Sequence, residues 1–406
     1  MYFLQNNVDI VSGAKRYCIY DLNTGKIYSL DSIHRGFLED LISNENSTEH
    51  IPRNLIDYFL ESEIVVCAEK LSDKLEPVND STMIQFAWIE ITQNCNLTCR
   101  HCYEESSKKV QKSDMKLSSF KLAIDCLHNI RTERIQLVGG EPILHNRIED
   151  MLEYAVDKFK SIEIFTNGTM LTNHLLDRIK HYGASLAFSV YSEDPVIHDY
   201  VTLTDGSFKS TFLNVESALS KGIEVRIASI EMRGVPKFQF TNLNVTHRSD
   251  LPRLTGRANL SLYSRSMLKK KLITKKSFKE PISPENYFRN RKNHNCFGKR
   301  LYIDVDLNVY PCAMERRVSY GNLFSKSISE MLCNDLFLLN KDRINGCMDC
   351  EYRYACFDCR ADSIKASIDS KPWYCTYNQD EGIWIDEDEF IELLLSDNVG
   401  YTMIAE

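Results

Sequence analysis

Ten of the fourteen cysteines in this chain of 406 residues fall into two clusters. The first places three thiols within eight residues, at Cys95, Cys99 and Cys102. The second, toward the C-terminus, comprises Cys296, Cys312, Cys347, Cys350, Cys356, Cys359 and Cys375. The chain opens without the charged and then apolar pattern of a secretory signal, and thiols in a reducing compartment rarely pair as disulfides. Metal ligation is therefore the chemistry that this cysteine usage predicts.

The stretch "NCNLTCRHCYEE" limits which metal centre the first cluster can hold. A structural zinc site closes with four ligands, and no fourth cysteine or histidine stands here at the usual finger spacing, although His101 could serve. A four-iron, four-sulfur cluster normally takes four thiolates as well. Three thiols on one loop therefore indicate a cluster with one iron left open for another ligand.

The segments around these thiols alternate between strand and helix from Phe86 onward. Apolar runs predict strands at residues 86–91, 134–138, 161–165, 185–190 and 223–230, with a sixth near "FQFTNLNV". Amphipathic helices such as "SSFKLAIDCLHNI" fill the gaps. Repeated strand-helix units predict an α/β fold with a parallel sheet, partly closed into a (β/α)6 TIM-type barrel. Chemistry in such sheets sits at the carboxyl ends of the strands, and the three thiols follow the first strand.

The CxxxCxxC spacing, together with "GGEP" after the second strand, resembles the radical S-adenosylmethionine (radical SAM) enzymes. The resemblance implies that SAM chelates the open iron and is cleaved by one electron to a 5'-deoxyadenosyl radical. It also implies that the adenine lies near His101 and that Asn167 and Ser189 border SAM. The residues implied for the amino group of SAM are Gly139, Gly140, Glu141 and Pro142. Two glycines let bare backbone approach a ligand closely.

The C-terminal thiols resemble the SPASM extension of radical SAM peptide-modifying enzymes, which holds two auxiliary [4Fe–4S] clusters. The family pattern assigns one cluster to Cys347, Cys350, Cys356 and Cys375. It assigns the other to Cys296, Cys312 and Cys359, whose fourth iron is open or bound by another group, with His294 nearby in sequence. Leu307 stands where the family has a glycine, and two residues rather than three separate Cys356 from Cys359. A zinc ribbon is the rival interpretation of residues 347–359.

The first 70 residues form a unit of their own in the sequence. A turn signal at residues 23–25 predicts a β-hairpin, two helices are expected at residues 32–42 and 53–60, and a closing strand at residues 63–67. This winged-helix-like pattern resembles the leader-binding element of ribosomal peptide maturases; the alternative is an extension packed on the main core. The other predicted segments are a linker (71–84), the radical SAM core (85–290), the SPASM domain (291–378) and an acidic C-terminal tail (379–406).

Together these resemblances imply a maturase of a ribosomally made precursor peptide, and "DCRADS" and "KPWYCTYN" more weakly resemble the grasp-with-spasm type. We expect an oxidative cross-link (thioether, C–C or ether), with SAM and three [4Fe–4S] clusters as cofactors and a flavodoxin or ferredoxin as reductant. The alternatives are a peptide epimerase, a sulfatase-type formylglycine-generating maturase and a zinc-binding winged-helix regulator. Ala313 stands where the sulfatase-activating enzymes have their aspartate base. The general base stays unassigned among Glu90, Tyr191, His198 and Asp304.

The charge distribution bears on location and partners. A net charge of −8 and no apolar run of eighteen residues favour a cytoplasmic protein that binds neither nucleic acid nor membrane. Residues 265–279 are rich in lysine and arginine, whereas residues 376–406 carry only acidic charges. Two solvated faces are the ordinary explanation; a functional one would let the basic stretch guide an acidic peptide into the barrel.

Overall fold

The computed structural model describes residues 1–43, 48–67, 72–75, 84–107, 109, 112–235, 237–240, 243–363 and 367–396. Most of the predicted linker and the last ten residues of the predicted acidic tail lie outside these described residues. In the described part, no helix combines the length and the apolar character needed to cross a membrane.

A nine-stranded sheet forms the main body, in the order β11-β10-β9-β8-β7-β6-β12-β13-β14. Six consecutive strands of this sheet are parallel to one another: β6 (Phe86–Thr92), β7 (Arg134–Gly139), β8 (Ser161–Thr166), β9 (Ser185–Ser189), β10 (Val225–Ile230) and β11 (Thr246–Asp250). This confirms the predicted α/β fold with a parallel sheet. The sixth strand, however, begins at Thr246, after the predicted segment. Phe240 of that segment packs against Phe212 instead, because its apolar ring joins the core under the helices.

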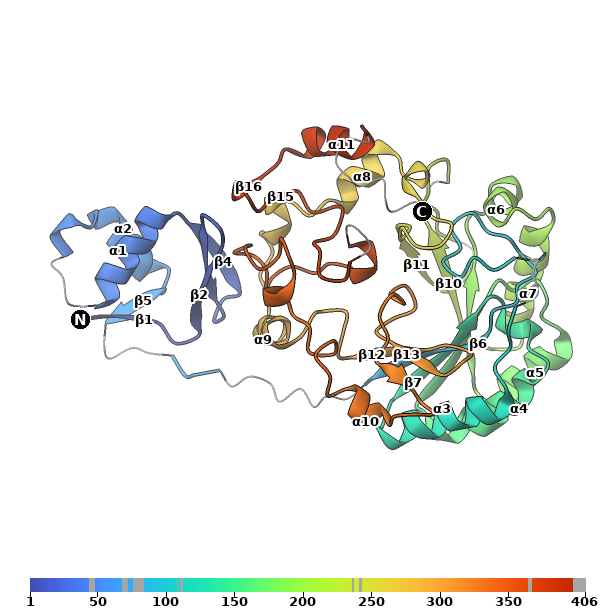
Figure 1. Cartoon of the computed structure of the whole chain (residues 1–406). Helices are drawn as coiled ribbons and strands as arrows, with labels where there is room; N and C mark the ends of the chain where they lie inside the picture. Colours follow the sequence, from blue (N-terminus) through green and yellow to red (C-terminus); the bar gives the residue numbers. More distant parts are fainter. Residues whose placement is uncertain are drawn as a thin grey trace.

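Helices follow the strands and line the outside of the sheet (Figure 1). They are α3 (Leu117–Asn129), α4 (Ile148–Ala155), α5 (Asn173–His181), α6 (Pro195–Thr202) and α7 (Ser207–Ser220), with 3₁₀ turns η2 (Pro142–Leu144) and η3 (Val156–Lys158). Helix α5 begins at the Thr172 hydroxyl, which accepts from Leu175 N, and buries one apolar face. Strand residues Ile89, Leu137 and Ile164 meet these faces in one core, so the sheet presents its other face to the barrel interior.

The C-terminal region begins inside the same sheet. Strand β12 (Arg300–Ile303) pairs in parallel with β6, and β13 (Asn308–Tyr310) and β14 (Gly321–Asn322) extend it antiparallel. The remaining elements are α8 (Arg265–Lys271), α9 (Pro284–Lys292), α10 (Ile328–Met331), β15 (Tyr377–Asn378), β16 (Ile383–Trp384), α11 (Glu387–Leu395), and the 3₁₀ turns η4 (Leu260–Leu262), η5 (Lys275–Phe278), η6 (Lys341–Arg343) and η7 (Arg360–Asp362). The segment predicted as SPASM therefore shares its first strands with the barrel.

The N-terminal module has two small sheets and two helices. The elements are β1 (Tyr2–Leu4), β2 (Val8–Ser12), β3 (Tyr17–Asp21), β4 (Lys26–Leu30), α1 (Ser32–Ser43), η1 (Thr48–His50), α2 (Arg53–Glu61) and β5 (Val65–Cys67). The predicted hairpin and both helices are confirmed, and β5 pairs with β1 rather than with the hairpin. In Figure 1 the C-terminal segment lies between this module and the barrel.

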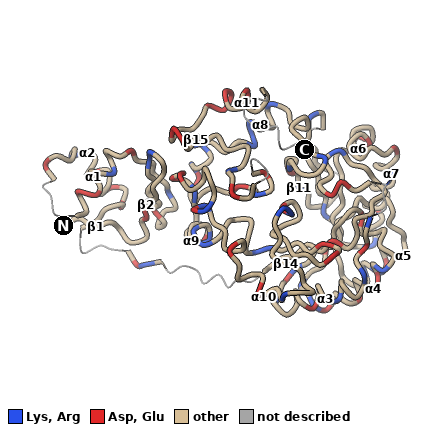
Figure 2. Tube along the Cα trace, viewed as in Figure 1, with Lys and Arg blue, Asp and Glu red and all other residues tan. Residues whose placement is uncertain are grey.

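The basic and acidic segments lie against each other. Helices α8 and α11 run side by side, blue charges beside red ones (Figure 2). Arg265 and Lys269 pair with Asp388 at 3.0 and 2.7 Å, and Lys276 pairs with Glu387 at 2.8 Å. Helix α11 also buries three apolar residues, Phe390, Ile391 and Leu394. Part of the predicted acidic tail is therefore a helix that packs against α8. Its carboxylates pair with several of the basic residues in segment 265–279, for which a role in guiding an acidic peptide was the functional explanation.

Candidate active site and auxiliary cysteine sites

The three-thiol loop follows β6 and is fixed from two sides. Toward α6, Arg100 N donates to Val201 O at 3.0 Å. From a later segment, Arg257 donates through its guanidinium to the carbonyls of Cys99 and Ser106, each at 2.9 Å. These bonds satisfy the backbone of a loop that lacks secondary structure of its own. These contacts with other segments therefore fix the conformation of the loop.

Two residues that contact this loop, Gly256 and Arg257, were not predicted from the sequence. Gly256, at φ +58°, lies so close that an added Cβ would sit 2.5 Å from the carbonyl oxygen of Cys102. Its neighbour Arg257 contacts Cys99 across 158 residues of chain. No motif marks a contact over such a separation, so only the folded arrangement identifies these two residues.

The loop thiols lie within electrostatic reach of one another. Burial, and next the charge of Glu141, raises the pKa of Cys95 to about 12, with a further contribution from Cys102. Burial also raises the pKa of Cys99, and the thiols of Cys95 and Cys102 raise it further. Thiols with such pKa values keep their protons until a metal displaces them. Among the described residues, no three His, Cys, Asp or Glu side chains are gathered tightly enough for a single metal ion.

The GGEP segment packs onto the cysteine loop through its glycines. Gly139 has φ +139°, and a Cβ there would lie 1.9 Å from Thr92 O. A Cβ on Gly140 would lie 2.3 Å from Asn94 O, and Gly140 N donates to Thr92 O at 2.9 Å. The sequence attributed these glycines to the close approach of a ligand. The structure gives them a further role, the approach of their own backbone to the loop that carries the thiols.

Glu141 and Asn167 brace the ends of β7 and β8. The Glu141 carboxylate accepts from Thr166 Oγ1 and Asn167 N, each at 2.6 Å, and from Ile143 N at 3.1 Å. Burial raises the pKa of Glu141 to about 7, against the effect of these hydrogen bonds. The Asn167 amide in turn lies 3.9 Å from Cys95 Sγ. The structure thus brings both predicted residues to the thiol loop, with Glu141 already engaged by the protein. Pro142 begins the 3₁₀ turn η2 and is buried.

His101 and Ser189 meet at Tyr191. The His101 ring lies 4.9 Å from the Tyr191 ring, and its Nδ1 is buried without a hydrogen-bond partner in the described part of the chain. Burial, and then Arg257, lowers the pKa of His101 to about 4, so its imidazole is neutral. Burial, and then Cys99, raises the pKa of Tyr191, whose side chain hydrogen-bonds Ser189. The unpartnered Nδ1 beside three thiols is a position that a bound ligand would satisfy.

The four candidate bases differ in their surroundings. His198 Nδ1 accepts from Tyr191 N at 3.3 Å, and burial lowers the pKa of His198 to about 4. Asp304 accepts from the amides of Asp306 and Asn308, so its carboxylate stabilises the turn between β12 and β13. Tyr191 lies against the thiol loop, and its raised pKa leaves it protonated. These features give His198 and Asp304 structural roles.

Glu90 is the fourth candidate, and it points into the barrel. Its neighbours Ile89 and Ile91 face the helices, so strand alternation directs Glu90 inward. Burial, and then the charge of Glu104, raises the pKa of Glu90 to about 8. Arg316 Nη1 lies 3.7 Å from Glu90 Oε1, which has no hydrogen-bond partner among the described residues. A buried carboxyl that holds its proton near neutral pH can take part in proton transfer.

The C-terminal thiols form two groups by proximity. In the second auxiliary set (Cys296, Cys312 and Cys359), the pKa of Cys296 is raised to about 12, mainly by burial and next by the thiol of Cys312. The pKa of Cys312 is also raised to about 12, mainly by burial and next by the thiol of Cys359. In the first auxiliary set (Cys347, Cys350, Cys356 and Cys375), burial raises the pKa of every thiol, and that of Cys356 to about 11. Cys375 adds to the shifts of its three partners. These electrostatic effects act between members of each predicted set; the assignment of the sets, and the cluster that each would bind, stay predictions.

His294 does not offer a free nitrogen to the second auxiliary set. Its Nε2 lies 2.7 Å from Asp358 Oδ1, and its Nδ1 accepts from Cys296 N at 3.1 Å. The suggestion that His294 supplies a fourth ligand is therefore not supported. Leu307, in place of the family's glycine, has φ +68° and is fully buried in the core. The turn thus keeps the left-handed conformation that suits glycine, and burial of the leucine offsets its strain.

Residues 89–241 match the radical SAM superfamily. The chain contains a radical SAM domain. Its sheet carries the three thiols and GGEP at the carboxyl ends of β6 and β7. The superfamily implies SAM and one [4Fe–4S] cluster. The mutual proximity of the thiols and the unpartnered His101 Nδ1 fit these two groups.

Curated relatives match parts of the chain. The antilisterial bacteriocin subtilosin biosynthesis protein AlbA of Bacillus subtilis is 32% identical over 152 residues, which is 37% of this chain and 34% of that protein. An AdoMet-dependent heme synthase of Methanosarcina barkeri is 24% identical over 337 residues, which is 72% of this chain and 95% of that protein. The chain spans about a third of the length of AlbA.

Solved structures share the fold over most of the chain. Streptococcus suis SuiB bound to precursor peptide SuiA gives a TM-score of 0.55 at 11% identity and covers 89% of this chain and 96% of that one. Native anSMEcpe with bound AdoMet gives 0.52 at 17% identity, covering 78% of this chain and 100% of that one. At these identities the likeness concerns the radical SAM fold alone.

Proposed function

We propose that this radical SAM enzyme modifies a ribosomally synthesised precursor peptide by forming an oxidative intramolecular cross-link. One observation carries the proposal: in addition to the three-thiol loop, the chain has two further sets of thiols, of which Cys347, Cys350 and Cys375 are buried and the other four are half-buried. A reaction that removes two hydrogens from a peptide must dispose of electrons, and auxiliary clusters at these sets would accept them. The similarity to the bacteriocin biosynthesis protein AlbA and the shared fold with SuiB, which is bound to a precursor peptide, support the same substrate class.

Each group of residues has a role in this proposal. When bound, SAM and its cluster would supply the 5'-deoxyadenosyl radical that takes a hydrogen atom from the peptide. The cysteine loop, held by Gly139, Gly140 and Arg257, fixes that chemistry at the mouth of the barrel. Glu90 lies on the interior face of β6 and is the proposed proton-transfer residue, because its Oε1 is buried without a hydrogen-bond partner among the described residues. A flavodoxin or ferredoxin is the proposed source of the reducing electron.

The N-terminal module is the proposed binding site for the precursor. Strand β4 has a neighbour on one side only among the described residues, so its other edge can pair with an added strand. Beside it lies a cavity of about 360 Å³ between β4 and α2. Tyr28 and Tyr58 line this cavity with rings 6.2 Å apart, edge to face. An extended peptide would place side chains there.

The alternatives explain fewer of these features. The formylglycine-generating reaction of the sulfatase-activating enzymes uses an aspartate at the position of Ala313, which here packs with Val138 and Tyr302. Epimerisation leaves no electrons to be passed on, so it gives no use for two auxiliary sets. A zinc-binding winged-helix regulator leaves the barrel and its GGEP segment without a role.

Co-expression with the short open reading frame beside the gene tests the reaction. Mass spectrometry of the isolated peptide is expected to show a loss of two hydrogens that requires Cys95, Cys99 and Cys102. An unchanged mass with altered chirality would instead establish epimerisation. A Cys95→Ala variant is the control, because it removes one thiol of the SAM loop and keeps the auxiliary sets.

Binding of the precursor is tested separately by calorimetry. Tyr58→Ala opens the cavity and removes one aromatic wall, so the affinity for the precursor is expected to fall at least tenfold. Phe324→Ala is the matched control, because this ring is 74% exposed and lies outside the N-terminal module. Equal affinities for both variants would remove the cavity from the proposed binding site.

A further inference from the structure

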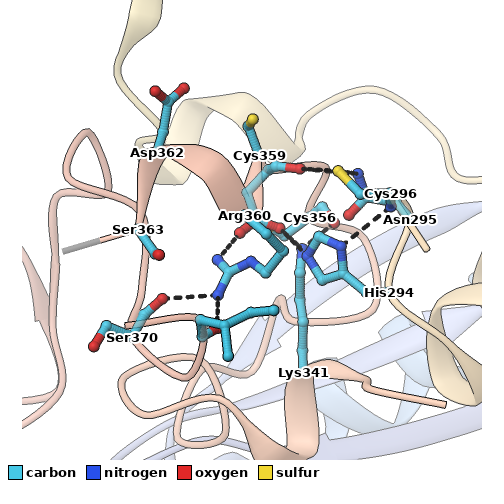
Figure 3. A network of polar contacts seen from close by, with 12 residues as sticks. His294, Asn295, Cys296, Lys341, Cys356, Cys359, Arg360, Asp362, Ser363 and Ser370 are labelled. Carbon is cyan, nitrogen blue, oxygen red and sulfur yellow. Dashed lines mark hydrogen bonds and ion pairs between the residues drawn. The ribbon is translucent and has the colours of Figure 1, made fainter. Parts of the chain in front are cut away.

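A network of buried polar groups connects Cys356 of the first auxiliary set with Cys296 of the second (Figure 3). Lys341 Nζ lies 2.8 Å from Asp358 Oδ1, and Arg360 pairs with Asp358 Oδ2. The Lys341 ammonium also donates to the carbonyl of Cys356, a member of the first auxiliary set. The Asp358 carbonyl accepts from the thiol of Cys296, a member of the second, at 3.3 Å. One carboxylate residue thus connects both sets.

These charges are withdrawn from water. The side chains of Asp358 and Arg360 are 0% exposed, and that of Lys341 is 2% exposed. Lys341 pairs with one oxygen of the Asp358 carboxylate and Arg360 with the other, so each buried charge has a partner of opposite sign in place of water. Two cations and one anion are therefore buried together, with a net charge of about +1.

The excess charge is positioned toward thiols of both sets. Arg360 directly follows Cys359 of the second set in the chain, and its guanidinium is held by Asp358 and by the carbonyls of Ile368 and Ser370. Lys341 is directed to the first set through the carbonyl of Cys356. A buried ion group gives little net stability compared with apolar residues of similar size, because each charge loses its hydration. The buried positive charge is better explained by a function, namely that it stabilises negative charge at the thiol sets on both sides of it.

We propose that Lys341, Asp358 and Arg360 form a shared counter-charge for the two auxiliary clusters and thereby set their reduction potentials. The three are positioning residues, since none of them reacts. The inference rests on the auxiliary clusters of the proposed function. Net charge around an iron–sulfur cluster shifts its potential, because each added electron is stabilised by nearby positive charge. Lys341 favours reduction of the cluster at the first set, Arg360 favours reduction of the cluster at the second, and Asp358 joins the two cations.

A charge series tests this proposal in the full, cluster-loaded chain. Lys341→Met brings the buried net charge to zero, Asp358→Asn raises it to about +2, and the double variant Lys341→Met/Asp358→Asn restores about +1. The potentials are measured by redox titration monitored by electron paramagnetic resonance. Lys341→Met is expected to shift the equilibrium of the first-set cluster at least tenfold toward the oxidised form, about 59 mV for one electron. Asp358→Asn is expected to shift it the opposite way.

The controls separate charge from structural damage. Lys270→Met removes an exposed lysine, whose charge is screened by water, and is expected to leave both potentials unchanged. If the single variants lose iron, the double variant decides: iron content and potentials near those of the unmodified chain support the proposal, and continued loss contradicts it. Potentials that do not follow the buried net charge also overturn it. The iron content of the unmodified chain is measured before any variant is made. If it accounts for the SAM cluster alone, the auxiliary clusters are absent and the proposed function itself is contradicted.

Discussion

Gly139 shows how a single hydrogen in place of a side chain positions a metal-binding loop. The residue joins the end of β7 to the backbone that follows β6, where a Cβ would lie 1.9 Å from a carbonyl oxygen. The same strand β6 carries Glu90 toward the barrel interior, where burial sets its protonation. The position of the cysteine loop thus depends on the absence of one Cβ atom, and the protonation of Glu90 depends on its burial.

Gly139→Ala is expected to displace the cysteine loop and to lower both iron binding and the thermal midpoint. The control is Gly183→Ala, which has φ +64° but no heavy atom within 4 Å of an added Cβ. That control carries only the left-handed strain of about 1–2 kcal/mol. Iron analysis and thermal unfolding of both variants make the comparison. Equal losses in the two variants would show that backbone strain, not the contact with Thr92, matters.

Glu90→Gln is expected to flatten the dependence of stability on pH. The folded chain holds the Glu90 proton up to about pH 8, whereas the unfolded chain releases it near its ordinary value of 4.5. Between these values the folded state binds more protons, so the stability from this group falls as pH rises, by up to about 1.4 kcal/mol per pH unit. Urea unfolding of the metal-free chain from pH 5 to pH 8 measures the slope. An unchanged slope in the variant would show that Glu90 ionises normally.

At the scale of elements, helices α8 and α11 are joined by surface ion pairs and by apolar packing. The ion pairs are exposed, and exposed pairs contribute little and are screened by salt. The apolar face of α11 is buried with Tyr263, Met267 and Trp373. Packing rather than charge is therefore expected to hold the helix in place.

Leu394→Ala is expected to cost about 2–5 kcal/mol of unfolding free energy, because it leaves a cavity under α11. Asp388→Asn removes the carboxylate shared by Arg265 and Lys269 and is expected to have a much smaller effect that vanishes in high salt. Urea unfolding at low and high salt measures both. A larger loss for Asp388→Asn would assign the docking to electrostatics.

The elements differ in how far the sequence could predict them. The parallel strands were predictable because strands buried on one face and lining a barrel on the other are strongly apolar and regularly spaced. The sixth strand was misplaced because Phe238 and Phe240 have strand-like composition but pack beneath the helices. The thiols and glycines of the site were found from spacing. Gly256, Arg257 and the pairing of α8 with α11 were not, because long-range contacts leave no local pattern.

At the scale of the whole molecule, the N-terminal module is anchored on the wall of the first auxiliary set. Tyr20 of β3 is fully buried, its ring is 4.9 Å from that of Tyr287, and its hydroxyl donates to Glu351 O at 3.1 Å. Ala14 N also donates to Asp349 O at 2.8 Å. The proposed peptide-binding module therefore packs directly against residues that adjoin the first auxiliary set, the proposed site of an electron acceptor.

Tyr20→Ala is expected to loosen this anchor and to speed hydrogen exchange both in the module and at residues 349–354. Its matched control is Ile19→Ala on the same strand, because Ile19 faces the module's own core. That control is expected to speed exchange within residues 1–67 only. Mass-spectrometric exchange distinguishes the two. Unaltered protection at residues 349–354 in Tyr20→Ala would show that the module and the wall are independent.

The place of β12 in the main sheet bears on how the protein is made. β6 ends at Thr92, but its second neighbour, β12, begins only at Arg300. While the ribosome is still synthesising the intervening helices, one edge of β6 has no partner, and an unpaired edge invites association with other chains. A nascent chain stalled before residue 300 should therefore need chaperone protection. The three cysteines of the loop after β6 are translated before that interval ends, whereas the second auxiliary set is complete only after Cys359 and the first only after Cys375.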